Sequence, residues 1–421
     1  MSNNFATATR TPAVVVGLDN VTGLQTARIL AQHNIPVIGL AKDPLSHFCR
    51  TKACKGVLQA NTDNGDLLSG LLALASELKE RPVLFPCSDA SVLLISRNRR
   101  QLEDSFHIAL PDAQVVETLM DKVGFYRYAM ERELPIPQTF FISSGEDLED
   151  AIRALTFPCI LKPPLKTDLW EKNSKAKVLK IPDVNSLRKI YQDCSRWAEM
   201  LILQEWVEGT DNDLFSCNCY FNQQSVPLVT FISRKIRQWP PETGVSSLGE
   251  ECRNDLVLEQ SIQLFQSIGY RGLGYVEMKR DVRTGKHFII EPNIGRPTAR
   301  SAIAEAGGVS LLYAAYCDIL GEPLPANLQQ KYGKAKWIYL RRDIQSAVHY
   351  WRQGTLPLKQ WLQSWQGVRR DAVFSWTDPG PFWGELRRCV RLIVTNRERL
   401  SKSPLRQWAV GFRSFPKGDQ L

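Results

Sequence analysis

Residues 269–300 read GYRGLGYVEMKRDVRTGKHFIIEPNIGRPTAR, and this stretch decides the fold. It contains two apolar, strand-like runs joined at Asp281–Gly285 by residues that favour turns. The predicted hairpin brings three oxygen-bearing side chains together across neighbouring strands: Glu277, Glu291 and Asn293. Oxygen ligands of this kind suit Mg²⁺, with Mn²⁺ as an alternative, and phosphate oxygens can complete the metal shell. From this stretch alone, an ordinary hairpin with exposed acidic residues is the other interpretation.

Groups suited to a nucleotide recur at the ends of other predicted elements. Four side chains place a positive charge at strand or helix ends, where it suits phosphate groups: Lys122, Lys162, Lys235 and Arg296. The predicted strand LILQEWV (201–207) runs out into a loop, and its main chain offers hydrogen bonds to adenine at Gln204, Glu205 and Val207. Asp211 or Asp213 then suits the ribose hydroxyls. The sequence thus contains a candidate for each part of an ATP site.

One reaction uses all of these parts. A carboxylate is a poor electrophile, but ATP can convert it to an acyl phosphate, which an amine then attacks. Such a site needs Mg²⁺ to bridge phosphates and cations to offset the charge on the transferred phosphoryl group. We expect Lys162, Lys235 and Arg296 to stabilise that charge in the transition state. No side-chain nucleophile is required.

The order of these motifs resembles the ATP-grasp superfamily, which includes biotin carboxylase and D-alanine–D-alanine ligase. The motifs that follow Lys122 are FPCILKP (157–163), LILQEWVEG (201–209), GYVEMKRD (274–281) and FIIEPNIGR (288–296). The sequence is more closely similar to bacterial carboxylate–amine ligases of that superfamily, through SRKIRQWPPETGVSSLGE (233–250) and EPNIGRPTAR (291–300). This resemblance covers about residues 11–325. It implies an ATP-dependent carboxylate–amine ligase that releases ADP and phosphate.

The resemblance also implies residue roles. Lys122 and Lys162 match the lysines that contact the ATP phosphates, and Lys235 falls where a basic strand end faces the triphosphate. The remaining matches are Gln204, Glu205 and Val207 in the adenine hinge, Glu277, Glu291 and Asn293 as Mg²⁺ ligands, and Arg296 beside the acyl phosphate or substrate carboxylate. Two features depart from the family pattern. Residues 163–177 contain no glycine, so lysines there, including Lys177, are expected to replace main-chain phosphate contacts. The family often has its arginine two residues after the asparagine, whereas here Gly295 intervenes between Asn293 and Arg296.

We expect an α/β protein in which an open parallel α/β domain (1–118) precedes the ATP-grasp domain (119–325). The ATP-grasp lobes are predicted at about 119–200 and 201–325, and a basic, mostly helical tail at 326–421. Strand and helix patterns alternate over residues 11–115, which predicts the parallel sheet. The first turn has only Gly17 and Gly23 in place of a G-x-G-x-x-G fingerprint, which disfavours a dehydrogenase. Asp89 is expected either to cap a helix or to contact substrate.

Composition and charge limit the cellular setting. The chain has 421 residues, 43% of them hydrophobic, and 10 scattered cysteines, a pattern typical of a globular protein with free thiols in a reducing cytosol. We expect no signal peptide, because the start (MSNNFATATRTPAVVVG) has no apolar h-region and no cleavage site. We expect no spanning helix either, because no apolar run approaches about 18 residues. Cytoplasmic location is therefore predicted.

The tail differs from the body in charge. Residues 326–421 contain 18 Lys and Arg against 6 Asp and Glu, a net charge of +12, which leaves −3 for residues 1–325. The tail also holds 7 of the 11 tryptophans. Nucleic acid, anionic lipid or an acidic protein can each explain a basic aromatic tail; we expect no nucleic acid and favour contact with a membrane's inner face or an acidic protein. A non-catalytic ATP-binding scaffold that docks by this tail is the alternative function, and an oligomer is compatible with the sequence.

Overall fold

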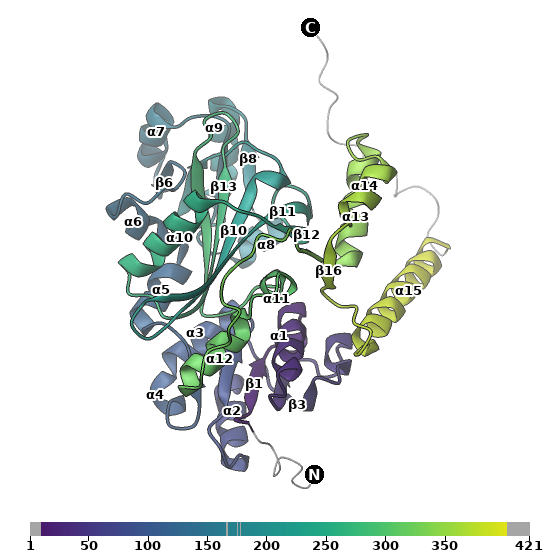
Figure 1. Ribbon diagram of the computed structural model, residues 1–421. Coiled ribbons are helices and arrows are strands. Elements are labelled where there is room, and N and C mark those ends of the chain that lie inside the picture. Colours follow the sequence, from purple (N-terminus) through teal and green to yellow (C-terminus); the bar gives the residue numbers. More distant parts are fainter. Residues whose placement is uncertain (1–9, 166, 175, 177, 402–421) are drawn as a thin grey trace.

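The computed structural model describes residues 10–165, 167–174, 176 and 178–401 (Figure 1). Its N-terminal domain is built on a five-stranded parallel sheet in the order β3-β2-β1-β4-β5. The strands are β1 (Ala13–Val16), β2 (Val37–Ala41), β3 (Cys54–Gln59), β4 (Val83–Pro86) and β5 (His107–Ile108). The helices that follow are α1 (Val21–Gln32), η1 (His47–Arg50), α2 (Asp66–Glu77), α3 (Asp89–Arg97), α4 (Arg99–Leu102) and α5 (Ala113–Met120). The apolar strand β1 is buried throughout because it lies at the centre of this sheet. The predicted open parallel α/β unit is confirmed.

A four-stranded antiparallel sheet follows, in the order β6-β9-β7-β8. Its strands are β6 (Thr139–Ile142), β7 (Cys159–Lys162), β8 (Leu179–Ile181) and β9 (Leu201–Glu205). The accompanying helices are α6 (Lys122–Glu131), α7 (Gly145–Ala154), α8 (Asp168–Asn173) and α9 (Val184–Cys194). The predicted lobe limit near residue 200 falls just before β9. This strand pairs with β6 and β7, so it belongs to the four-stranded sheet.

The third sheet has seven strands in the order β14-β13-β10-β11-β12-β15-β16. The strands are β10 (Leu214–Phe221), β11 (Pro227–Trp239), β12 (Val245–Glu251), β13 (Gly272–Arg280), β14 (His287–Ile294), β15 (Lys336–Ile338) and β16 (Val368–Asp371). The helices of this part are η2 (Asp211–Asp213), α10 (Asp255–Ser267), α11 (Ile303–Ala306), α12 (Leu311–Leu320), α13 (Leu340–Arg352), α14 (Leu358–Ser364) and α15 (Gly380–Ser401). The hairpin predicted at residues 269–300 is confirmed as β13–β14, with Glu277 directly opposite Glu291.

The C-terminal region, residues 326–401 of the described chain, adds to this sheet rather than lying beside it. β15 pairs antiparallel with β12 and parallel with β16. The region also contacts the N-terminal domain: Arg28 Nε donates to Asp378 Oδ2 over 2.8 Å, and Trp337 Nε1 donates to Gln25 Oε1 over 2.7 Å. In Figure 1 the helices α13, α14 and α15 line one side of the molecule, and α15 packs on η1.

Two short loops shape the chain after the hairpin. Gly308, which takes a left-handed φ of +85°, separates α11 from α12. β15 ends at Ile338, and the backbone N–H of Leu340 donates to Asp371 as α13 begins. Among the described residues, no helix is both long and apolar enough to cross a membrane.

Candidate active site

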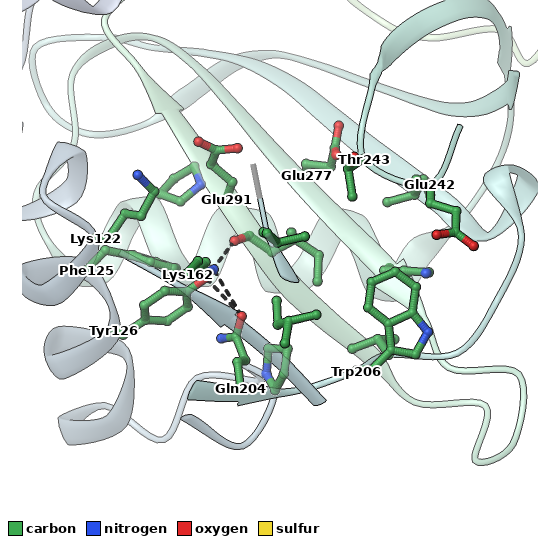
Figure 2. A pocket seen from close by; sticks show the side chains of 18 of the residues that line it. Lys122, Phe125, Tyr126, Lys162, Gln204, Trp206, Glu242, Thr243, Glu277 and Glu291 are labelled. Atoms are coloured by element: carbon green, nitrogen blue, oxygen red, sulfur yellow. Dashed lines mark hydrogen bonds between the residues drawn. The ribbon is translucent and has the colours of Figure 1, made fainter. Parts of the chain in front are cut away.

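A cavity of about 300 Å³ lies between the four-stranded sheet with α6 and the seven-stranded sheet (Figure 2). Both sides contribute charged side chains, and these include Lys122, Lys162, Lys235, Lys279, Glu277 and Glu291. Apolar groups such as Phe125, Ile160 and Ile290 form much of the remaining wall. Residues from distant parts of the sequence therefore line one cavity, which has a charged part and an apolar part.

Lys162 is the predicted phosphate lysine on the four-stranded sheet, and 9% of its surface is exposed. It is the last residue of β7, and its Nζ donates to Tyr126 Oη over 3.0 Å and to Gln204 Oε1 over 3.1 Å. Figure 2 shows both bonds as dashed lines. The Nζ also lies 4.9 Å from the centre of the Tyr126 ring. These neutral partners hold the ammonium group without neutralising its charge, which leaves it suited to an anionic ligand.

Lys122, at the start of α6, is held at the rim of the same cavity. Its Nζ donates to the carbonyl of Pro164 over 2.8 Å, and Asp121 caps the helix by accepting from the backbone N–H of Gly124. The predicted site residue Lys177 lies outside the described residues.

Lys235 and Glu277 form an ion pair at the side of the cavity made by the seven-stranded sheet. Lys235 Nζ lies 2.9 Å from Glu277 Oε1, and only 4% of the Lys235 surface is exposed. Burial lowers the pKa of Lys235, while the neighbouring Glu277 carboxylate opposes this shift. Glu277 also accepts a hydrogen bond from Tyr275 Oη over 3.3 Å. The strand pairing sets Glu291 directly across from Glu277, so both carboxylates line the cavity.

Asn293 and Arg296 lie beyond Glu291 on the same strand and the loop after it. Arg296 Nη2 donates to Asn293 Oδ1 over 2.9 Å, and Arg296 Nε donates to Asp89 Oδ1 over 2.6 Å. Arg296 therefore joins the hairpin to α3 of the N-terminal domain. Ser88, rather than Asp89, caps α3. Neither Asn293 nor Arg296 is part of the cavity lining formed by the described residues.

The predicted adenine hinge spans the last residues of β9 and the loop after it. Gln204, Glu205 and Val207 all line the cavity. The backbone N–H of Glu205 donates to Gln138 and that of Trp206 to Pro158, so the hinge is fixed to the strands beside it. The Gln204 side chain is buried and donates to Thr139 Oγ1 over 2.7 Å. The outer edge of the hinge is closed by Trp206, whose ring lies against two ammonium groups, Lys180 at 4.2 Å and Lys279 at 4.4 Å.

Asp211 and Asp213, the ribose candidates, are both buried and hydrogen-bonded within the protein. Asp211 accepts from the backbone and side-chain nitrogens of Gln238, over 3.1 and 2.7 Å. Asp213 accepts from Arg280 Nη2 over 2.7 Å. Neither carboxylate is part of the described cavity lining. Contact with a ribose therefore stays a prediction for both.

The predicted metal ligands are compatible with Mg²⁺ only in combination with a bound phosphate. Among the described residues, no group of three or more His, Cys, Asp or Glu side chains is arranged to hold a metal ion. Glu277, Glu291 and Asn293 offer two carboxylates and an amide, which are the oxygen donors that Mg²⁺ shares with phosphate oxygens and water. The ammonium group of Lys235 against Glu277 shows that this position favours positive charge. The donor set thus fits Mg²⁺ bound together with a nucleotide.

The cavity residues missed by the sequence reasoning include Tyr126 and Gln238. Tyr126 lies four residues after Lys122, so a helical spacing argument can place both on one face of α6. Gln238 lines the cavity together with Lys235, although residues three apart in a regular strand face opposite sides. A register shift between Lys235 and Arg237 makes this orientation possible, and nothing in the local sequence signals it.

Comparison with known proteins supports a common fold. No protein-family model matches the chain. The sequence is 23% identical over 231 residues to the D-aspartate ligase of Enterococcus faecium (strain Aus0004), which covers 52% of this chain and 54% of that protein. The chain thus spans about half the length of this curated relative.

Two solved structures are similar over more of the chain. N5-carboxyaminoimidazole synthetase from Staphylococcus aureus gives a TM-score of 0.60 at 15% identity and covers 80% of this chain and 83% of its own. Biotin carboxylase from Campylobacter jejuni, in a β-γ-ATP complex, gives a TM-score of 0.60 at 12% identity, with 76% and 73% covered. At these identities the similarity establishes a shared fold.

Proposed function

We propose that this chain, which has the ATP-grasp fold, is an ATP-dependent carboxylate–amine ligase. One observation carries the proposal: Lys122, Lys162, Lys235, Glu277 and Glu291 converge on one cavity between two sheets. Cations suited to phosphates and carboxylates suited to Mg²⁺ therefore meet beside an enclosed hinge at Gln204–Val207. The similarity to a D-aspartate ligase supports the same class of reaction.

The reaction we propose proceeds in two steps. When bound, ATP·Mg²⁺ supplies the phosphoryl group and its counter-charge. A carboxylate oxygen of the first substrate forms a bond to the γ-phosphorus, and ADP leaves. The amine nitrogen of the second substrate then forms a bond to the acyl carbon, loses a proton, and phosphate leaves, so that an amide remains.

The chain's residues act on charge in both steps. Lys162, held by neutral partners, keeps its positive charge for the phosphates. Glu277 and Glu291 are the proposed metal ligands, with Asn293 as the third. With a metal ion held by Glu277, Lys235 would be available to phosphate oxygens. Arg296 is proposed to bind the acyl phosphate or the substrate carboxylate, in exchange for its contact with Asp89.

D-aspartate is the first substrate to test, because it carries an amine and two carboxylates and appears in the name of the relative. ADP release should be measured with the full chain over a panel of carboxylates paired with amines, D-aspartate included on each side. We expect ADP release to need both partners. Tight ATP binding without turnover across the panel would instead favour the scaffold function.

Glu291→Ala tests the metal site. We expect it to abolish ADP release while the protein stays folded, because the variant lacks one of two carboxylates that face the phosphates. Glu259→Ala, on the exposed surface of α10, is the matched control and should retain activity. Normal turnover by Glu291→Ala would contradict the metal assignment.

The C-terminal region supports a further proposal, that the protein is cytoplasmic and makes peripheral contact with an anionic membrane surface. On α15, Trp383, Leu386 and Val390 are exposed and lie within about 60° of one another around the helix axis. Arg387 and Arg391 are exposed beside this face, and Trp376 is exposed just before the helix. Apolar and aromatic groups flanked by arginines suit the boundary between lipid tails and anionic headgroups.

Co-sedimentation with phosphatidylglycerol-containing vesicles tests this contact. Binding should weaken as salt rises, because the Debye length shortens, and should weaken in a Trp383→Ser variant. Absence of binding at low salt would overturn the membrane proposal and leave an acidic protein as the partner to seek.

A further inference from the structure

A continuous set of hydrogen bonds connects helix α13, in the C-terminal region, to the cavity. Tyr350 Oη donates to Asp211 Oδ2 over 2.8 Å. Gln238 Nε2 donates to Asp211 Oδ1 over 2.7 Å, and Gln238 Oε1 accepts from Lys235 Nζ over 3.2 Å. Lys235 Nζ in turn pairs with Glu277 Oε1 over 2.9 Å. Tyr350 is therefore three hydrogen bonds from Lys235.

The chemistry of these groups determines which atom of the Gln238 amide faces each neighbour. An ionised carboxylate only accepts hydrogen bonds, so Asp211 must face the amide nitrogen of Gln238 rather than its oxygen. The amide oxygen of Gln238 is then the atom presented to the ammonium group of Lys235. Gln238 is 1% exposed and Lys235 is 4% exposed, so water does not compete for these contacts. A change at Asp211 thus alters what Lys235 encounters.

The same helix also holds the distorted part of β11. The register of β11 against β12 shifts around Ile236 and again at Ser247, a β-bulge that lets Lys235 and Gln238 both face the cavity. Arg237, between them, instead donates to Asp343 of α13 over 2.8 and 3.0 Å. Bulges of this kind re-aim side chains, and here two residues of the C-terminal region, Asp343 and Ser364, accept hydrogen bonds from Arg237 in the bulged segment.

We propose that Tyr350 is a positioning residue for Lys235, whose ammonium group it fixes at the cavity through Asp211 and Gln238. This inference rests on the proposed function, because it assigns Lys235 to the nucleotide phosphates. It also gives the C-terminal region a role inside the ligase site, separate from the membrane contact made by α15. Asp211 then acts through Gln238 rather than on the nucleotide.

A double-mutant cycle tests the coupling. The binding of Mg²⁺ with AMP-PNP, a non-hydrolysable ATP analogue, is measured by calorimetry for the full chain, Tyr350→Phe, Lys235→Met and the double variant. Tyr350→Phe removes one hydroxyl and keeps the ring. We expect it to weaken binding about fivefold when Lys235 is present and less than about twofold in the Lys235→Met background.

Tyr220→Phe is the matched control. Tyr220, which is buried, likewise donates to a carboxylate, Asp318 Oδ2, over 2.7 Å, but this bond lies outside the set that reaches Lys235. Its effect on binding should be small and equal in both backgrounds, although both substitutions lower the thermal midpoint.

Each outcome separates the inference from the proposed function. If the wild-type chain does not bind Mg²⁺ with AMP-PNP, the proposed ATP site itself fails. If it binds, and Tyr350→Phe weakens binding equally with and without Lys235, Tyr350 has only a structural role and the inference is overturned. A loss that depends on Lys235 supports it.

Discussion

Replacing Asp343 with alanine should be among the most damaging single changes in the C-terminal region. Asp343 is completely buried at the start of α13, and it accepts from Arg237 Nε and Nη2. The indole nitrogens of Trp361 and Trp365 donate to its Oδ2 over 2.8 and 3.0 Å. One carboxylate thus satisfies a guanidinium group and two tryptophans in a region closed to water.

The loss in free energy of unfolding follows from the unpaired charge that Asp343→Ala leaves in the core. Arg237 has 5% of its side chain exposed, so Asp343→Ala leaves a buried cation without its anion. Breaking a buried pair in this way costs about 3–5 kcal/mol, since the remaining charge keeps its desolvation penalty. Removing both charges should cost less, so Arg237→Leu combined with Asp343→Leu should be more stable than Asp343→Ala.

Urea unfolding followed by tryptophan fluorescence measures these differences. Asp255→Ala is the control: its ion pair with Arg253 is 69% and 67% exposed at the two side chains, and its loss should leave the midpoint almost unchanged. The reasoning is refuted if Asp343→Ala is as stable as Asp255→Ala, or if the double variant is the least stable of the set.

Three further changes have definite expected outcomes. Hydrogen bonds from Arg283 lower the pKa of Asp281 to about 2; because this pKa is depressed from about 4 in the unfolded chain, the stabilisation is complete above pH 4 and lost as pH falls towards 2. Asp281→Asn should therefore cost about 2 kcal/mol at pH 7 and much less at pH 3, as measured by urea unfolding at both values. Gly295→Ala should lower the free energy of unfolding by about 2 kcal/mol in the same assay, because Gly295 has a φ of +67° and an added Cβ would lie 2.4 Å from Leu110 Cδ2; an unchanged stability would contradict the left-handed turn before Arg296. Lys162→Met should weaken binding of Mg²⁺ with AMP-PNP at least about tenfold by calorimetry, since the phosphates lose a buried cation, and equal affinity would remove Lys162 from the site.

The parts predicted from sequence are those that local pattern determines. The β13–β14 hairpin has two apolar strands joined by a turn at Asp281–Gly285. Its pairing could therefore be expected, together with the approach of Glu277 to Glu291. Lys162 could be placed because an apolar run ends on it. In each case the relevant contact follows from strand alternation over a few residues.

The missed parts depend on contacts between distant segments. Arg237 and Asp343 are 106 residues apart, and their pairing follows from where α13 packs. The four residues of β16 (VRRD) have no clear alternation, and they become a strand because the edge of β15 offers partners. Tertiary context decides such short segments.

The placement of β15 has a consequence for how the chain can be divided. A protein cut after residue 325 would leave β12, a seven-residue strand, with one row of unpaired N–H and C=O groups. Such an open edge invites pairing with a second molecule and aggregation. In the full chain the outermost strand is instead β16, which is short and carries Arg369, Arg370 and Asp371. The basic region thus covers the open edge of β12 and leaves a short, charged edge strand that disfavours self-association.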